Sequence, residues 1–150
     1  MAAEGPLRYY GGKKIVAMEI IQHFPKSCGM YVEPFFGGGG IFFQLPPELY
    51  PVQIVNDLNR SLVTFYRVLR TRTDDLVRVC KLTPYSLDEQ RTCRNSAEDP
   101  KDDELETARR VWVRHRQNFA GTQHSGTGWS RPMPGVSMAK NTESALKQLH

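Results

Sequence analysis

The apolar positions of the first seventy residues alternate between helical and strand-like spacing. Helical stripes predict one helix over 13–24 and a second over 58–69. The short apolar run Met30–Val32 is typical of a buried strand, and Val52–Val55 is predicted to form a second strand. A shorter helix is expected to begin over 41–45. Since helices and strands alternate, this order predicts an α/β fold with a parallel sheet.

The second half of the chain has a different character. A helix is predicted over 105–118, a glycine- and proline-rich irregular segment follows over 121–135, and helical spacing returns from 141. Six acids and one lysine lie over 98–106, a net charge of −5, whereas six bases and no acid lie over 107–140. These blocks either suit the dipole of the predicted helix or provide a basic surface.

Composition limits the class of protein. The chain has 150 residues, of which 39% are hydrophobic and 24% charged, and a formal charge of +4. These values are typical of one globular domain and exclude a disordered or collagen-like chain. No apolar run is long enough to span a membrane and no secretory signal opens the chain, so we expect a cytoplasmic protein.

Cysteine and histidine spacing predicts neither disulfides nor a metal site. Cys28, Cys80 and Cys93 are odd in number and show no C-x-x-C spacing. The four histidines form no pair at helical spacing. Free thiols in a reducing compartment are therefore expected.

A glycine-rich turn follows the first predicted strand. Glu33, Pro34, Phe35 and Phe36 lead into four glycines over 37–40. Glycine allows positive φ values and a close approach of the backbone to a ligand. Such turns lie at the carboxyl ends of strands, where open α/β sheets bind ligands. A flexible loop without a ligand is the alternative.

Asp57 favours a ligand. It follows the second strand, where a carboxylate can accept hydrogen bonds from both ribose hydroxyls of a nucleoside. The turn matches neither G-x-G-x-x-G nor a P-loop. Glu33 would repel a pyrophosphate but suits a ligand with a positive centre, such as S-adenosylmethionine.

Three motifs in order carry a family resemblance. They are Arg8-Tyr9-Tyr10-Gly11-Gly12-Lys13, the segment from Val32 to Gly39, and Asn56-Asp57-Leu58-Asn59. Together they resemble the Dam-type DNA adenine methyltransferases, which modify the exocyclic amine (N6) of adenine. The resemblance covers residues 8–70 well and the remainder loosely. It implies a Rossmann-like S-adenosylmethionine-dependent methyltransferase sheet with an inserted, mostly helical target-recognition region.

The resemblance also assigns roles to residues that bind the cofactor. Tyr9 and Lys13 would help to close the pocket, and Asp57 would hold the ribose. Glu33, Phe35 and the backbone of the turn, at Gly37 and Gly39, would hold the methionine moiety. Tyr9 stands where the family has tryptophan, which keeps an aromatic face.

The resemblance further divides the chain and makes duplex DNA the expected partner, in a nucleoid-associated protein. Residues 1–70 would form the cofactor-binding half, 71–140 the DNA-binding insert, and 141–150 the return to the catalytic domain. Phe119-Ala120-Gly121 is similar to the Phe-Asn-Gly that opens a DNA-reading hairpin in this family, and the basic stretch from Arg109 to Arg131 can neutralise phosphates. The candidate DNA-binding residues are Arg8, Arg116, Gln123, His124 and Arg131.

The family's catalytic Asp/Asn/Ser-Pro-Pro-Tyr/Phe motif is absent from the sequence. Pro46-Pro47 is preceded by Leu45 and followed by Glu48, and Thr83-Pro84-Tyr85 has one proline. We therefore expect an incomplete, amino-terminal portion of an adenine methyltransferase, inactive alone and without a catalytic residue of its own. The alternatives are a non-catalytic DNA-binding module and a methyltransferase of another substrate class.

Overall fold

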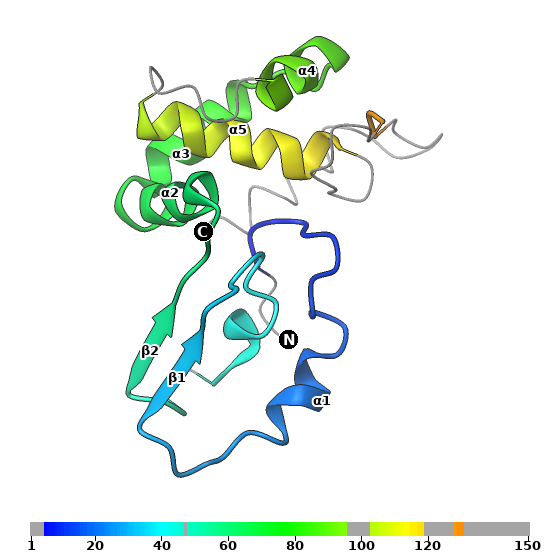
Figure 1. Ribbon diagram of the computed structural model, residues 1–150. Coiled ribbons are helices and arrows are strands. Elements are labelled where there is room, and N and C mark those ends of the chain that lie inside the picture. Colours follow the sequence, from blue (N-terminus) through cyan, green and yellow to red (C-terminus); the bar gives the residue numbers. More distant parts are fainter. Residues whose placement is uncertain (1–4, 47, 96–102, 119–127, 131–150) are drawn as a thin grey trace.

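The computed structural model describes residues 5–46, 48–95, 103–118 and 128–130. A two-stranded parallel sheet lies to one side of a cluster of helices (Figure 1). The strands are β1 (Met30–Glu33) and β2 (Val52–Val55), and their register pairs Met30 with Val52 and Glu33 with Val55. Both predicted strands and their parallel pairing are confirmed, but the expected burial of the first strand is wrong: of the eight strand residues only Tyr31 is buried, and all four residues of β2 are exposed.

The first helix is shorter than the spacing predicts. Helix α1 covers only Ala17–Ile21, not 13–24. Before it, Val16 N–H donates to the Lys13 carbonyl, and after it Phe24 N–H donates to the Ile21 carbonyl. Both bonds span three residues, so the flanking turns are tighter than an α-helix. The expected helix over 41–45 is likewise a single 3₁₀ turn, η1 (Phe42–Gln44).

Capping residues fix the ends of the two long helices. Helix α2 is Arg60–Thr71, and the side chain of Asn59 accepts a hydrogen bond from Leu62 N–H at its start. Helix α5 is Glu104–Gln117, and the carboxylate of Asp103 accepts from Glu106 N–H at 2.7 Å. Asparagine and aspartate at this position satisfy an N–H that the helix leaves open. These helices correspond to the predictions over 58–69 and 105–118.

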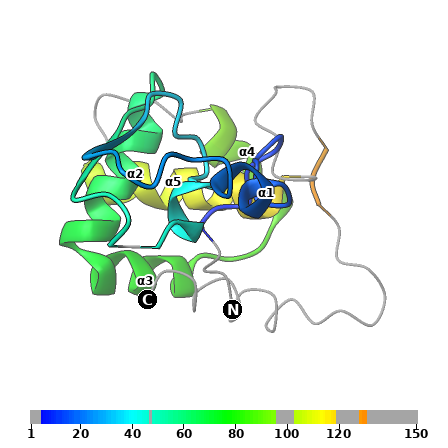
Figure 2. The same ribbon diagram turned by 90° about the horizontal axis from the view of Figure 1, so that it is seen from below.

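Two shorter helices, α3 (Thr73–Leu82) and α4 (Leu87–Asn95), complete the cluster. Helix α5 packs against α2, α3 and α4, and in the view from below it runs across the whole cluster behind the other elements (Figure 2). The core of this helical cluster contains large buried side chains from α2, α3 and α5, among them Leu62, Phe65, Leu76, Val111 and Trp112.

A second, smaller apolar cluster supports the sheet. Ala17 of α1 packs there with Tyr31 of β1, and Ile41, Leu45 and Tyr50 come from the connection between the strands.

Within the described ranges, no helix is both long and apolar enough to cross a membrane. The same residues contain no group of three or more histidine, cysteine, aspartate or glutamate side chains that could hold a metal ion. Cys80 and Cys93 are buried free thiols, and Cys28 is an exposed one.

Candidate functional site

The turn after β1 adopts a conformation that favours glycine. Gly37 and Gly39 have φ values of +53° and +65°, in the left-handed region where a Cβ is strained. Gly39 N–H donates to the Phe36 carbonyl at 2.9 Å, and Phe43 N–H donates to the Gly39 carbonyl at 3.0 Å. The turn thus passes directly into η1, and its expected positive φ values are confirmed.

Asp57 ties this turn to the start of α2. Its Oδ2 accepts a hydrogen bond from Gly37 N–H at 2.8 Å, and its Oδ1 accepts one from Asn59 N–H at 2.9 Å. Asn56 N–H donates to the Glu33 carbonyl at 2.9 Å, which continues the strand pairing up to this point. The parallel strands therefore bring the turn and the acid, twenty positions apart, into direct contact.

Glu33 is a partly desolvated carboxylate at the end of β1. The Tyr31 hydroxyl donates a hydrogen bond to its Oε2 at 2.7 Å. Burial raises the pKa of Glu33 above its usual range, although the Tyr31 hydrogen bond and the charge of Lys13 act in the opposite direction. A cationic group bound beside Glu33 would compensate for the lost solvation.

Tyr9 lies directly on the glycine turn. A Cβ built on Gly38 would lie 2.5 Å from Tyr9 Cβ, and one built on Gly37 would lie 3.2 Å from Tyr9 Cε1. Burial raises the pKa of Tyr9, and the negative charge of Asp57 adds to that increase. The N-terminal motif and the turn therefore form one site, together with Asp57.

The remaining glycines are also explained by close packing within the protein. A Cβ on Gly39 would lie 2.5 Å from Phe43 Cε2 and 2.8 Å from Phe36 Cζ, and one on Gly40 would lie 2.9 Å from the Lys14 nitrogen. The interpretation that absent side chains make room for a ligand is therefore incomplete, because neighbouring residues occupy much of that room.

Two exposed apolar side chains lie in the segments that follow the two strands. Phe35 follows β1 and is 81% exposed, and Leu58 follows Asp57 and is 92% exposed. In the sequence, Leu58 reads as the first residue of the helical stripe over 58–69, so nothing there marks it as a site residue. In the structure it precedes α2. Phe35 and Leu58 are candidates for packing against a flat ligand ring. Lys13 is exposed, within electrostatic reach of Glu33.

At the end of α5, Gln117 and Asn118 pair with Trp129 and Ser130, and these four residues form the base of the intervening segment. Asn118 and Trp129 form an antiparallel bridge, and Ser130 N–H donates to the Gln117 carbonyl at 2.9 Å. The Tyr85 hydroxyl donates to the Ser130 carbonyl at 2.9 Å and holds this base against the residues that precede α4. Residues 117–118 and 129–130 thus lie side by side at the end of α5. Gln123, His124 and Arg131 lie outside the described residues.

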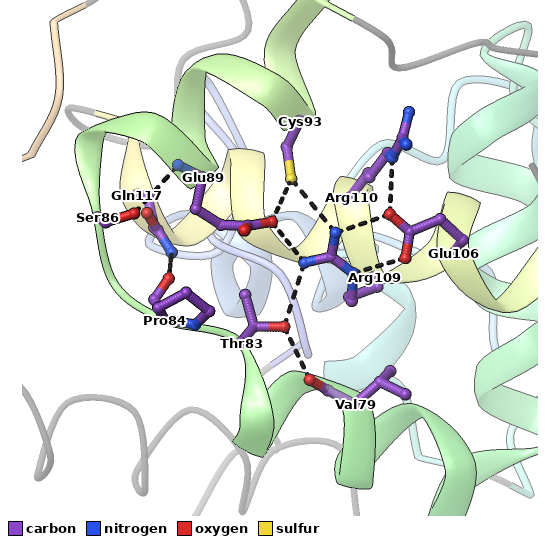
Figure 3. A network of polar contacts seen from close by, with 10 residues as sticks. All are labelled: Val79, Thr83, Pro84, Ser86, Glu89, Cys93, Glu106, Arg109, Arg110 and Gln117. Atoms are coloured by element: carbon purple, nitrogen blue, oxygen red, sulfur yellow. Dashed lines mark hydrogen bonds and ion pairs between the residues drawn. The ribbon is translucent and has the colours of Figure 1, made fainter.

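Part of the basic stretch is used inside the protein. Arg109 donates hydrogen bonds to Glu89 Oε1 at 2.6 Å and to both carboxylate oxygens of Glu106 at 2.7 Å (Figure 3). Arg110 donates to Glu106 Oε1 at 2.8 Å. The Arg109 guanidinium thus links α4 to α5, whereas Arg110 pairs with Glu106 within α5. The first two arginines of the basic stretch therefore have acidic partners inside the protein.

Two of the candidate DNA-binding residues, Arg8 and Arg116, lie within the described part of the chain. Arg8 is exposed beside Tyr9 in the N-terminal motif, whereas Arg116 is half-buried in the last turn of α5. His115, which precedes Arg116, has no sequence feature that marks it as a neighbour of the turn. Its ring is buried and stacks on Tyr9 with a centroid separation of 5.4 Å. Only the tertiary structure reveals that contact.

The chain is similar in sequence to known DNA methyltransferases. The family model of the D12 class N6 adenine-specific DNA methyltransferases matches residues 9–147. A type II methyltransferase, M1.LlaDCHI of Lactococcus lactis subsp. cremoris, is 29% identical over 120 residues, 76% of this chain and 41% of the relative. The DNA adenine methylase of Serratia marcescens is 36% identical over 72 residues, 48% of this chain and 25% of the relative.

The DNA adenine methylase of Escherichia coli K12 is 33% identical over 75 residues, 50% of this chain and 26% of the relative. The chain thus spans between a quarter and about two fifths of the length of these three relatives. Since the family model matches almost the whole chain, the protein belongs to the D12 class of N6 adenine-specific DNA methyltransferases.

Proposed function

We propose that the chain binds S-adenosylmethionine at the glycine turn and duplex DNA through the helical half. The complete enzyme would move the methyl group to the exocyclic amine of adenine. Residues 1–70 would hold the cofactor, 71–140 would contact DNA, and 141–150 would lead back toward the catalytic part. The bridge that Asp57 makes between Gly37 and Asn59, at the ends of two adjacent parallel strands, carries this proposal.

The residues around the turn fit the cofactor chemically. Each carboxylate oxygen of Asp57 uses one lone pair on a backbone N–H, and a carboxylate has about four acceptor sites. Both oxygens can therefore still accept from ribose hydroxyls. Glu33 would face the amine of the methionine moiety, and Tyr9 would close the turn. When bound, S-adenosylmethionine supplies an electrophilic methyl group.

Calorimetry with S-adenosylhomocysteine tests the cofactor site. Glu33→Gln keeps the side-chain shape but removes the charge that faces an amine, so we expect affinity to fall at least about tenfold. Asp57→Ala should abolish the signal. Glu48→Gln, at an exposed acid outside the turn, is the matched control and should bind as the wild type does.

Thermal unfolding of each variant separates lost binding from lost folding, since Asp57 also holds the turn together. Absence of binding by the wild type, or unchanged binding by folded Glu33→Gln and Asp57→Ala proteins, would contradict the cofactor proposal.

Fluorescence anisotropy tests the nucleic-acid partner. Phosphate contacts release counterions, so affinity for duplex DNA should fall steeply as salt rises. At fixed salt, duplex DNA should compete better than duplex RNA. Equal competition would favour another substrate class, and DNA binding without cofactor binding would favour the non-catalytic module.

A tritiated-methyl transfer assay on mixed duplex DNA tests turnover. The amine of adenine is a poor nucleophile because its lone pair is conjugated with the ring. The motif that orients it in this family is absent from the sequence. We expect no methyl incorporation by the chain alone, and robust turnover would contradict that expectation.

A further inference from the structure

Helix α5 reaches the glycine turn through a pair of stacked rings. The imidazole of His115 and the ring of Tyr9 have centroids 5.4 Å apart and planes inclined by 26°. In Figure 1 the dark-blue segment before α1 runs up beneath the yellow α5. This stack joins the helix that precedes the proposed DNA-reading segment to the N-terminal motif.

The His115 ring has a fixed orientation. It is 1% exposed, and its Nδ1 lies 2.8 Å from the Val111 carbonyl oxygen one turn earlier. A carbonyl oxygen can only accept, so Nδ1 carries the proton. Burial lowers the pKa of His115 to about 4, and the charges of Arg114 and Arg116 act in the same direction. The ring is therefore neutral at pH 7 and offers a flat, rigid face to Tyr9.

Tyr9 also contacts the glycine turn. Its Cε1 lies 3.2 Å from the Cβ position of Gly37, and its Cβ lies 2.5 Å from that of Gly38. Gly37 N–H in turn donates to Asp57. Contacts thus continue without a gap from His115 through Tyr9 and Gly37 to the acid proposed to hold the ribose.

We propose that His115 is a positioning residue for the cofactor site: its ring holds Tyr9 against Gly37 and Gly38, so the helical half sets the shape of the turn. The inference rests on the proposed function, because it assigns to α5 a part in binding S-adenosylmethionine. It also explains why a polar ring occupies a buried position of α5, where an aliphatic side chain could fill the space without desolvating nitrogen atoms.

A double-mutant cycle measured by calorimetry with S-adenosylhomocysteine tests the inference. Stacked aromatic pairs contribute about 0.5–1.5 kcal/mol, so His115→Ala should weaken binding by about two- to tenfold. His115→Phe keeps a flat ring and should stay within about twofold of the wild type. In a Tyr9→Ala background, His115→Ala should change affinity by less than about twofold, because the ring it supports is gone.

Cys93→Ala is the matched control for a loosened helical core. Cys93 is buried in α4, and its polar contacts are with Glu89 and Arg109. It should lower the melting temperature without changing affinity for S-adenosylhomocysteine, whereas His115→Ala should change both.

Three results would overturn the inference. They are an equal loss of affinity from His115→Ala with and without Tyr9, a tenfold loss in folded His115→Phe, and a loss in Cys93→Ala as large as that in His115→Ala. If the wild type does not bind at all, the proposed function fails and the inference fails with it. Wild-type binding combined with additive losses rejects the inference alone.

Discussion

At the scale of single residues, Gly39 and Gly11 differ in the steric contacts that an added Cβ atom would make. Gly39 combines a positive φ with aromatic neighbours closer than 3 Å to its Cβ position, whereas Gly11 has φ +72° and open space around that position. We expect Gly39→Ala to lower the free energy of unfolding by about 3 kcal/mol, because strain and overpacking add. Gly11→Ala should lower it by about 1 kcal/mol, from backbone strain alone.

Urea denaturation of each variant measures this difference. Gly29 has no positive φ and no atom within 4 Å of its Cβ position, so Gly29→Ala is the control and should change the unfolding free energy by less than about 0.5 kcal/mol. Equal losses at Gly11 and Gly39 would show that aromatic packing does not define the turn.

His115 makes stability depend on pH. Its pKa is about 4 in the folded protein because of burial, against about 6.5 in an unfolded chain. Between these values the unfolded state binds more protons, so stability falls as pH decreases from 6.5 to 4. The expected loss is about 3 kcal/mol, and it is absent above pH 6.5, where the imidazole is neutral in both states.

Urea denaturation at several pH values, compared between the wild type and His115→Phe, isolates this contribution from that of the carboxylates. The difference in unfolding free energy between the two proteins should change by about 3 kcal/mol between pH 6.5 and pH 4. Parallel pH curves would contradict a buried, neutral imidazole.

At the scale of elements, charge holds α4 to the cluster. The side chains of Arg109 and Glu89 are only 15% and 20% exposed, whereas those of Arg67 and Glu104, which link α2 to α5, are 50% and 54% exposed. Removal of one partner from a buried pair leaves an uncompensated charge. Arg109→Met should therefore lower the unfolding free energy by about 3 kcal/mol, and Arg67→Met by less than about 1 kcal/mol.

Guanidinium chloride screens charges, so urea denaturation at low salt is the appropriate measurement. Hydrogen exchange should also show faster exchange of α4 amides in Arg109→Met than in Arg67→Met. Similar losses for both variants would mean that burial of the Arg109 network does not strengthen it.

Among the helices and strands, those with a regular pattern of apolar residues could be predicted from the sequence, and those without one could not. The β2 strand was predictable because three of its four residues, Val52, Ile54 and Val55, are β-branched and apolar. Helix α4 was not predictable on its own, since its polar sequence buries Gln90 and Cys93 and contacts α5 through Glu89. Such a helix carries no apolar stripe, because ion pairing takes the place of part of the usual core.

In the candidate site, too, one contact could be predicted from the sequence and another could not. Gly37 and Asp57 were predictable as neighbours because parallel strands end at one edge of a sheet. The contact between Tyr9 and His115 was not, since it joins two segments more than a hundred positions apart that share no periodicity. Local pattern thus identified the turn and the acid, whereas the packing of α5 on Tyr9 needed the structure.

At the scale of the whole molecule, the sheet leaves apolar side chains in contact with solvent. Val32 and Ile54 are partners in the parallel register and are 54% and 46% exposed. Parallel sheets are ordinarily covered on both faces, and exposed apolar patches bind hydrophobic dyes even in folded proteins. We therefore expect the folded chain to enhance the fluorescence of an anilinonaphthalene sulfonate dye.

The double variant Val32→Thr and Ile54→Thr should reduce that enhancement by at least about half, because register partners lie on the same face. Its unfolding free energy should change by less than about 1 kcal/mol, since threonine keeps the β-branched shape at half-exposed positions. Leu82→Thr, at an exposed leucine at the end of α3, is the control and should leave dye binding nearly unchanged. If the control reduces the signal as much as the double variant, the dye reports the helical half, and the sheet does not carry the principal apolar surface of this chain.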